Sequence, residues 1–328
     1  MTIFLLDHST NYGVFNLKKT AFLFPGQGAQ SIGMGLELYQ EYDFVRELFD
    51  MAEEVTKINL SRLCFKGPME DLTMTVNLQP AVTAVNLACL AAVEKEGVKP
   101  DITAGHSLGE FSALYASGAV SKEDVFRFVL KRGELMHRES LRHKGAMHAI
   151  IGLSIDDVDK LVKEVKAEGV VAVANHNTAY QIVTTGAPDQ VEKVSLLASS
   201  QGARTIPLKV SGAWHSELIK GAEDEFREFL ETVSFNTPEI PIIHNVTADF
   251  AMNPDEIKAV VAKQFCSPVR WYDSMCRLMD EKVEIFAEIG PGKVLTGLLK
   301  KILPEDYPCK IYNVNNMKTL EKFLQEVA

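Results

Sequence analysis

The stretch Gly105-His106-Ser107-Leu108-Gly109-Glu110 decides the fold of this chain. It has the pattern G-x-S-x-G, in which a serine lies on a tight turn between a strand and a helix. Residues 101–104 before it are apolar enough for a buried strand, and residues 110–116 after it are compatible with a helix. The two glycines leave room for a strained turn. We therefore expect an exposed Ser107 hydroxyl beside a helix N-terminus that can stabilise an oxyanion.

Strands, glycine-rich turns and helices alternate on both sides of this stretch. An apolar strand over residues 20–24 ends in the turn Pro25–Gly28, and after two helical patterns comes the strand before Ser107. The alternation predicts an α/β fold with a mostly parallel sheet, similar to that of α/β-hydrolases. Helices are expected over residues 36–52, 79–96, 122–139, 216–232 and 254–264. A further strand is expected over residues 240–244, and a C-terminal strand and helix around residues 285–303.

Residues 145–210 have a different pattern from the rest of the chain. Strands are expected at 146–151, 170–174, 181–185 and 204–210, and helices at 155–167 and 188–200. The order βαββαβ is the ferredoxin-like arrangement. We expect a small subdomain at 145–210, inserted into a large catalytic domain formed by 19–144 and 211–328. Residues 1–18 are interpreted as an N-terminal extension.

The bulk properties exclude several classes of protein. The chain has 328 residues and a net charge of −10, which argues against nucleic acid as a partner. Its five cysteines are an odd number without a C-x-x-C pair, so we expect neither a metal site nor a disulfide framework, and we expect a cytoplasmic location. No apolar run in the sequence is as long as a membrane span, and the N-terminus does not resemble a signal peptide.

A serine nucleophile needs a base, and eight histidines are available. His215 lies in a loop of small residues, 211–216, between a predicted strand and a predicted helix. The others lie in the N-terminal segment, beside the serine, on polar helices, in strands or in loops. They are His8, His106, His137, His143, His148, His176 and His244. Position alone leaves His215 as either the base or an ordinary capping or surface histidine.

Arg132 is a candidate for binding an anion. It follows the apolar run 125–130, and on the sequence alone a surface arginine is the more common interpretation. In a catalytic pocket, its guanidinium fork would select an acyl group that carries a carboxylate.

Seven motifs in order give the chain a resemblance that no single motif carries. They are Phe24-Pro25-Gly26-Gln27-Gly28-Ala29-Gln30, Gln79-Pro80-Ala81, Gly105-His106-Ser107-Leu108-Gly109-Glu110, Arg132-Gly133, Gly145-Ala146-Met147, Ala213-Trp214-His215-Ser216 and Gly290-Pro291-Gly292-Lys293-Val294-Leu295. Together they resemble the acyltransferase family of fatty acid and polyketide synthesis, to which the malonyl-CoA:acyl carrier protein transacylases belong. The resemblance covers about residues 20–303.

The resemblance implies roles for individual residues of the reaction centre. Ser107 would be the nucleophile and His215 the base. The backbone N–H groups of Gln27 and Leu108 would form the oxyanion hole. The backbone carbonyl of Gln264 would orient the base, in place of the acid of a catalytic triad.

The same resemblance implies the substrate contacts. Arg132 would pair with the malonyl carboxylate, and Gln79 would lie at the substrate. Arg204 would contact coenzyme A. Trp214 stands where the family more often has phenylalanine or serine, so the preference among acyl groups depends on it.

The function implied is transfer of a malonyl group from malonyl-CoA to the phosphopantetheine thiol of acyl carrier protein, by ping-pong kinetics through an ester on Ser107. Acyl carrier protein and the coenzyme A thioester are the expected partners, with no cofactor, no nucleic acid, no membrane and a monomeric enzyme. One alternative is a trans-acting acyltransferase that loads a polyketide synthase, and another is a serine esterase or thioesterase. A scaffold without activity is disfavoured, because both Ser107 and His215 are present.

Overall fold

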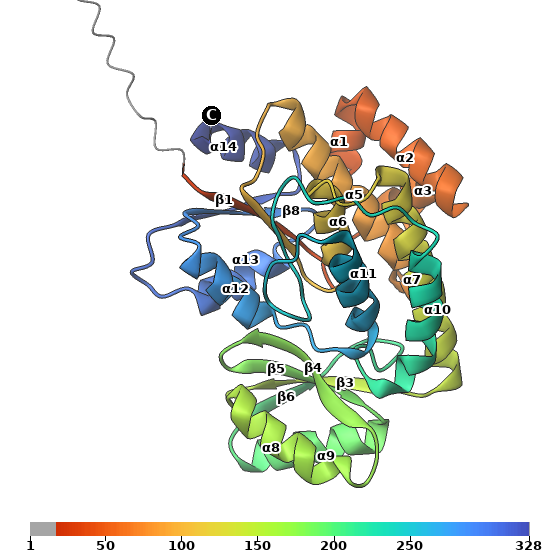
Figure 1. Ribbon diagram of the computed structural model, residues 1–328, viewed down its shortest axis with the longest axis vertical. Coiled ribbons are helices and arrows are strands. Elements are labelled where there is room, and N and C mark those ends of the chain that lie inside the picture. The colour runs from red at the N-terminus through yellow and green to blue at the C-terminus, as the bar shows by residue number, and fades with distance from the viewer. Residues whose placement is uncertain (1–17, 328) are drawn as a thin grey trace, which may run out of the picture.

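The computed structural model describes residues 18–327 and contains two β-sheets, each with its own helices (Figure 1). The larger sheet has five strands, all parallel, in the order β7-β2-β1-β8-β9. This is the order of doubly wound sheets, in which ligands bind outside the carboxyl ends of the strands. The predicted α/β fold with a parallel core is confirmed. The strands are β1 (Thr20–Phe24), β2 (Ile102–Gly105), β7 (Ile242–Ile243), β8 (Ile285–Ile289) and β9 (Lys310–Val314).

The central strand β1 is buried on both faces, as the apolar run Thr20–Phe24 predicts. Its side chains alternate between two cores. Phe22 and Phe24 belong to the larger core, and Ala21 and Leu23 to the core on the opposite face. The larger core contains residues of α2 (Asp43–Thr56), α5 (Thr75–Lys95), α7 (Lys122–Arg142) and α14 (Met317–Val327), and the other contains residues of α12 (Trp271–Asp280) and α13 (Val294–Ile302).

Helix α5 is the central helix of the larger core. Contrary to the expectation from the sequence, it is long and apolar enough to cross a membrane by length and composition, but 83% of its most apolar window is buried inside the protein. Its contacts with α2 and α7 account for that burial. In this structure α5 is therefore a core helix.

The second sheet consists of antiparallel strands in the order β4-β5-β3-β6. Its elements follow the chain order βαββαβ, as predicted, and lie together below the larger sheet in Figure 1. They are β3 (Ala146–Ile151), α8 (Ile155–Lys166), β4 (Val171–Thr178), β5 (Gln181–Gly186), α9 (Pro188–Ser200) and β6 (Arg204–Pro207). We propose residues 145–210 as the small subdomain and the flanking residues 19–144 and 211–328 as the large one.

Some elements differ from the sequence-based expectation. The helix expected over residues 36–52 is two helices, α1 (Leu36–Glu41) and α2, because Tyr42 between them is extended, with φ −117° and ψ 125°. The helix expected over 216–232 begins as a 3₁₀ turn, η1 (Glu217–Ile219), before α10 (Lys220–Leu230). The short helices α3 (Leu60–Lys66) and α4 (Met69–Thr73), together with α12, β9 and α14, were not expected. The proposed N-terminal extension lies, up to residue 17, outside the described residues.

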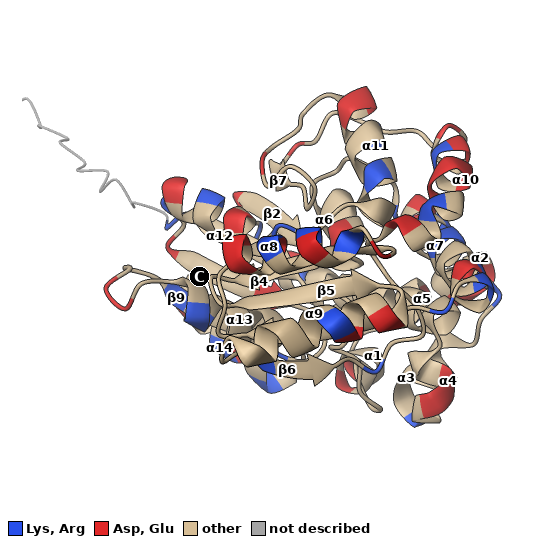
Figure 2. Cartoon of the chain, turned by 90° about the horizontal axis from the view of Figure 1, so that it is seen from below, with Lys and Arg blue, Asp and Glu red and all other residues tan. Residues whose placement is uncertain are grey.

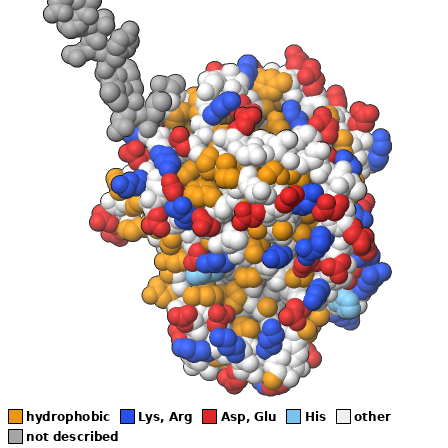
Figure 3. Space-filling model, in the orientation of Figure 1, with side chains coloured by type: hydrophobic (Ala, Val, Ile, Leu, Met, Phe, Trp, Pro, Cys, Tyr) orange, Lys and Arg blue, Asp and Glu red, His pale blue; other side chains and the backbone are white. Residues whose placement is uncertain are grey.

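Charged side chains lie mainly on the outer helices. Figure 2 shows blue and red segments on α2, α8, α9 and α10, while β4 and β5 carry none. On the face drawn in Figure 3, acidic and basic side chains are interspersed over both subdomains.

The remaining helices are α6 (Gly109–Ala116), α11 (Pro254–Lys263) and the 3₁₀ turn η2 (Gln264–Cys266).

Candidate active site

The site begins where β1 and β2 end. These strands are neighbours with Phe24 opposite Gly105, so the turns that follow them lie at the same edge of the sheet. Both flanking glycines of the serine motif are needed for that close approach. A Cβ on Gly105 would lie 2.1 Å from the carbonyl carbon of Gly109, and a Cβ on Gly109 would lie 1.9 Å from the carbonyl oxygen of Phe24. The spacing of the motif is therefore a packing requirement.

Ser107 sits on the turn between β2 and α6 in the left-handed region, with φ +50°. That backbone conformation is unfavourable for a residue with a side chain and persists only where the surroundings hold it. Asn245, two residues after β7, does so from the neighbouring strand. Its Oδ1 accepts from the Ser107 N–H at 2.6 Å, and its Nδ2 donates to the Gly105 carbonyl at 2.6 Å. The sequence analysis did not identify Asn245.

His215 reaches the serine from the loop after β6. Its Nε2 lies 2.9 Å from Ser107 Oγ, and its Nδ1 lies 2.9 Å from the backbone carbonyl of Gln264. A carbonyl can only accept, so Nδ1 carries the proton and Nε2 is free to take one from the hydroxyl. His215 is 4% exposed, and its φ of +61° is a second strained position at the site.

The surroundings keep this imidazole neutral. Burial, and then the positive charge of Arg132, lower the pKa of His215 to about 3. The hydrogen bond to the Gln264 carbonyl opposes the shift but does not cancel it. A neutral imidazole at physiological pH is the form that accepts a proton.

Arg132, on α7, is only 2% exposed. Its Nη2 donates to Ser107 Oγ at 3.1 Å and to Gln264 Oε1 at 3.0 Å, and its Nη1 donates to Gln79 Oε1 at 2.9 Å. Its Nε is buried without a partner among the described residues. Burial lowers the pKa of Arg132 to about 10, against the opposing effect of Glu110, so the side chain stays charged at neutral pH. A buried cation with a spare donor is a site for an anion.

Two backbone N–H groups lie at the same site. Leu108 follows the serine at the start of α6, and Gln27 lies on the turn after β1. Within residues 18–327, neither N–H donates a hydrogen bond to the protein. Such donors can serve an oxyanion.

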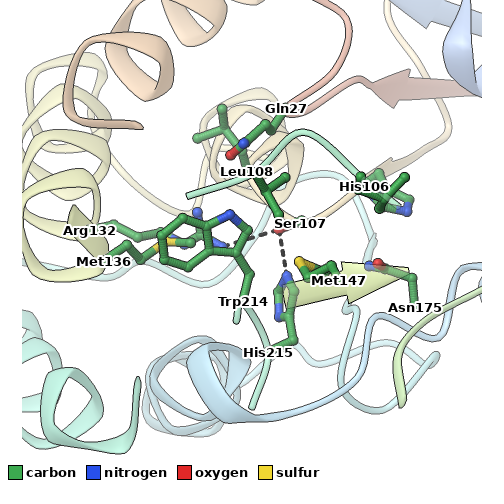
Figure 4. Close-up of a pocket in the computed structure, with 12 residues that line it drawn as sticks. Gln27, His106, Ser107, Leu108, Arg132, Met136, Met147, Asn175, Trp214 and His215 are labelled. Atoms are coloured by element: carbon green, nitrogen blue, oxygen red, sulfur yellow. Dashed lines mark hydrogen bonds between the residues drawn. The ribbon is translucent and has the colours of Figure 1, made fainter. Parts of the chain in front are cut away.

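Ser107, His215 and Arg132 line one pocket between the two subdomains (Figure 4). The large subdomain supplies Ser107, His215 and Arg132, and the small subdomain supplies apolar and amide side chains. The indole of Trp214 lies beside the serine and in front of Arg132 in Figure 4. The lining residues are Gln27, His106, Ser107, Leu108, Arg132, Met136, Met147, Asn175, Leu208, Val210, Trp214 and His215.

The structure brings together most of the predicted site residues and leaves one apart. Gln79 and Gln264 lie behind the pocket and contact its arginine. Arg204 is exposed at the start of β6 and does not line the pocket. In the sequence, Met147 was identified only as part of the motif Gly145-Ala146-Met147, without a role in the pocket. Met136 and Asn175 were not identified, because single apolar or amide residues in a helix or strand carry no local signal.

The chain is similar in sequence to known acyltransferases over most of its length. A model of the acyl transferase domain matches residues 21–321. A malonyl CoA-acyl carrier protein transacylase of Bacillus subtilis is 44% identical over 311 residues, 94% of this chain and 97% of that protein. The polyketide biosynthesis malonyl CoA-acyl carrier protein transacylase PksC of the same organism is 42% identical over 284 residues, 86% of this chain and 96% of that protein.

Solved structures show the same fold. In a complex of a type II polyketide synthase acyl-carrier protein with its malonyl-transacylase, a matching chain is 34% identical and superposes with a TM-score of 0.90. The match covers 94% of this chain and 99% of that one. The similarity therefore extends over both subdomains.

Proposed function

This chain belongs to the acyl transferase domain family, and we propose that its Ser107 carries a malonyl group from malonyl-CoA to acyl carrier protein. Its relatives are named for this activity. The observation that supports the assignment to these residues is the position of Ser107 Oγ, 2.9 Å from His215 Nε2 and 3.1 Å from Arg132 Nη2. A nucleophile with a base on one side and a buried cation on the other suits a short acyl group that ends in a carboxylate.

The first half-reaction forms the ester. Because Oγ accepts from Arg132, its own proton points to His215, which removes it as Oγ attacks the thioester carbonyl. The N–H groups of Leu108 and Gln27 stabilise the oxyanion. When the tetrahedral intermediate collapses, the C–S bond breaks, and the coenzyme A thiolate takes the proton from His215. Malonyl remains bound to Ser107 as an ester.

The second half-reaction reverses these roles. The phosphopantetheine thiol of acyl carrier protein gives its proton to His215 and attacks the ester carbonyl. The bond to Oγ then breaks, and Ser107 takes the proton back. The same base and oxyanion donors serve both steps, which gives ping-pong kinetics.

Arg132 accounts for the choice of acyl group. In the free enzyme its Nη2 donates to the serine hydroxyl and its Nε has no partner. A malonyl carboxylate bound to this guanidinium would receive charge-assisted hydrogen bonds. Acetyl would receive none, so a buried charge would stay without an anion beside it.

The same chemistry serves two pathways, fatty acid synthesis and polyketide synthesis, which differ in the carrier protein. The relatives from fatty acid and polyketide synthesis are 44% and 42% identical, a difference too small to separate them. The experiment that separates them is transfer from the malonylated enzyme to carrier proteins of each kind. Release of malonate to water faster than transfer would support the esterase alternative instead.

The location of the enzyme, its independence of cofactors, its oligomeric state and the role of Arg204 are predictions. All five cysteines are free thiols in the structure, which fits a cytoplasmic location. The mechanism above needs no cofactor and no metal, and a purified enzyme treated with a chelator should retain its activity. We predict a monomer, which sedimentation would test, and a contact of Arg204 with coenzyme A.

A further inference from the structure

A buried polar cluster lies directly behind the serine. It consists of Glu110, on α6, with His244 and Asn245, just after β7, and Gln264, and each of these four side chains is at most 1% exposed. The mechanism uses the backbone carbonyl of Gln264 but no atom of Glu110. A buried carboxylate needs hydrogen-bond donors, so its partners indicate what it does.

Every group in hydrogen-bond contact with the Glu110 carboxylate can donate to it. His244 Nδ1 lies 2.8 Å from Oε1, Gln264 Nε2 lies 2.5 Å from Oε2, and the Asn245 N–H lies 3.4 Å from the same oxygen. An ionised carboxylate accepts at both oxygens and donates nothing. The environment of Glu110 is therefore built for an acceptor.

Glu110 is one of three groups that set which way the Gln264 amide points. The Gln264 Nε2 donates to Glu110 and, at 3.1 Å, to the carbonyl of Ser107, while its Oε1 accepts from Arg132 Nη2 at 3.0 Å. With the amide reversed, its oxygen would face two acceptors and its NH₂ would face a guanidinium. The carboxylate thus presents the amide oxygen to Arg132.

The residues next in sequence place aromatic rings beside the same guanidinium. The Arg132 carbon Cζ lies 5.5 Å from the ring centre of Phe111 and 5.7 Å from that of Phe265. Phe111 follows Glu110, and Phe265 follows Gln264. The Glu110–Gln264 hydrogen bond therefore connects the two segments that carry these aromatic rings.

We propose that Glu110 is a positioning residue for the malonyl site: it fixes Gln264, which holds Arg132 in place for the substrate carboxylate. The proposal rests on the function proposed above. Glu110 does not touch substrate. Its effect should appear in the preference for malonyl over acetyl, because only malonyl needs Arg132.

Two substitutions separate position from charge. Glu110→Gln keeps an acceptor oxygen in place for Gln264, and its NH₂ group can face His244, because His244 Nε2 has no other partner in the described structure and the ring can move its proton there. Glu110→Asp keeps the charge but withdraws the carboxylate by one methylene group. Glu288 is a matched control: it is another carboxylate 1% exposed, but it accepts from Leu295 and Thr296 at the start of α13, away from the pocket.

The experiment measures kcat/KM for formation of the acyl-enzyme with malonyl-CoA and with acetyl-CoA. Glu110→Asp should lower the malonyl-to-acetyl ratio about tenfold or more, the effect expected from one hydrogen bond to a charged group. Glu110→Gln should stay within about threefold of the parent ratio. Glu288→Gln should lower the melting temperature and leave the ratio unchanged.

The outcomes are separable. An unchanged malonyl-to-acetyl ratio in Glu110→Asp, or an equal fall in kcat/KM for both thioesters, would overturn the proposal. A ratio in Glu110→Gln as low as that in Glu110→Asp would overturn it as well. If Glu110→Asp does not fold, Gln264→Leu cuts the same connection while keeping the backbone carbonyl, and the same fall in ratio is expected. A parent enzyme that forms no malonyl adduct would instead count against the proposed function.

Discussion

The guanidinium of Arg132 donates a hydrogen bond to the hydroxyl of Ser107, with Nη2 and Oγ 3.1 Å apart. The two residues are 25 positions apart in sequence. Arg132 lies on α7, and Ser107 lies on the turn before α6. The contact places the charge that would select the acyl group beside the atom that would attack it. The same pocket would therefore both select the acyl group, through Arg132, and transfer it, through Ser107.

The base can be tested by removing it. In His215→Ala the serine hydroxyl loses the group that takes its proton, so acylation by malonyl-CoA should slow by about 10²- to 10⁴-fold. Rapid-quench measurement of the malonyl-enzyme gives this rate. His143→Ala, an exposed histidine at the end of α7, is the control and should acylate at the parent rate. A His215→Ala rate within a few-fold of the parent would refute the assignment.

Arg132 can be tested through the acyl group. Arg132→Ala removes the charge-assisted hydrogen bonds to malonyl, which are worth about 1.5–3 kcal/mol, so the malonyl-to-acetyl ratio of kcat/KM should fall roughly 10- to 100-fold. Arg127→Ala is the matched control, because this arginine lies on the same helix but is half-exposed and pairs with Asp124. An unchanged ratio in Arg132→Ala would show that the carboxylate binds elsewhere.

The pH dependence of acylation follows from the buried base. Burial and Arg132 lower the pKa of His215 to about 3, so the base is neutral and active above that pH and protonated only below it. The kcat/KM for malonyl-enzyme formation should stay level as pH falls through 6.5, where an ordinary histidine would titrate. The profile is measured down to the pH at which the protein unfolds. An acid limb with its midpoint near 6.5 would contradict the geometry.

Trp214 should limit the size of the acyl group. Its indole is 4% exposed and lines the pocket next to His215, so a methyl branch on malonyl would meet the ring. One methyl group in such a pocket is worth about 1–3 kcal/mol, or roughly 10- to 200-fold in preference for malonyl-CoA over methylmalonyl-CoA. Trp214→Ser should narrow that preference. Competition between the two thioesters, followed by mass spectrometry of the acylated enzyme, gives the ratio, and an unchanged ratio would remove Trp214 from the specificity of the site.

Local sequence patterns predicted the frame of the site. Strands β1 and β2 are continuous apolar runs, and the two glycines around Ser107 report a close backbone approach that only glycine permits. The small subdomain was predictable for a similar reason, because its strands and helices alternate at short spacing. The break at Tyr42 was not, since residues 36–52 keep one helical pattern across it.

The supporting contacts could not be predicted from local pattern. Asn245 is 138 residues from the serine whose N–H it binds, and His244 is 134 residues from Glu110. Neither belongs to a motif with a fixed spacing. Glu110 was quoted as part of the serine motif, but its partners become visible only when β7 and η2 are packed against α6. Arg204 is exposed at the start of β6 and does not line the pocket, so its contact with coenzyme A stays a prediction.

The central claim is that malonyl is carried on Ser107, and intact mass spectrometry tests it most directly. The purified enzyme, mixed with malonyl-CoA and quenched in acid, should gain the mass of one malonyl group, and peptide mapping should place it on Ser107. Addition of phosphopantetheinylated acyl carrier protein before the quench should remove the adduct and load the carrier protein. Ser107→Ala should gain no mass under the same conditions. A parent enzyme without an adduct, or a Ser107→Ala variant that still acquires one, would contradict the account.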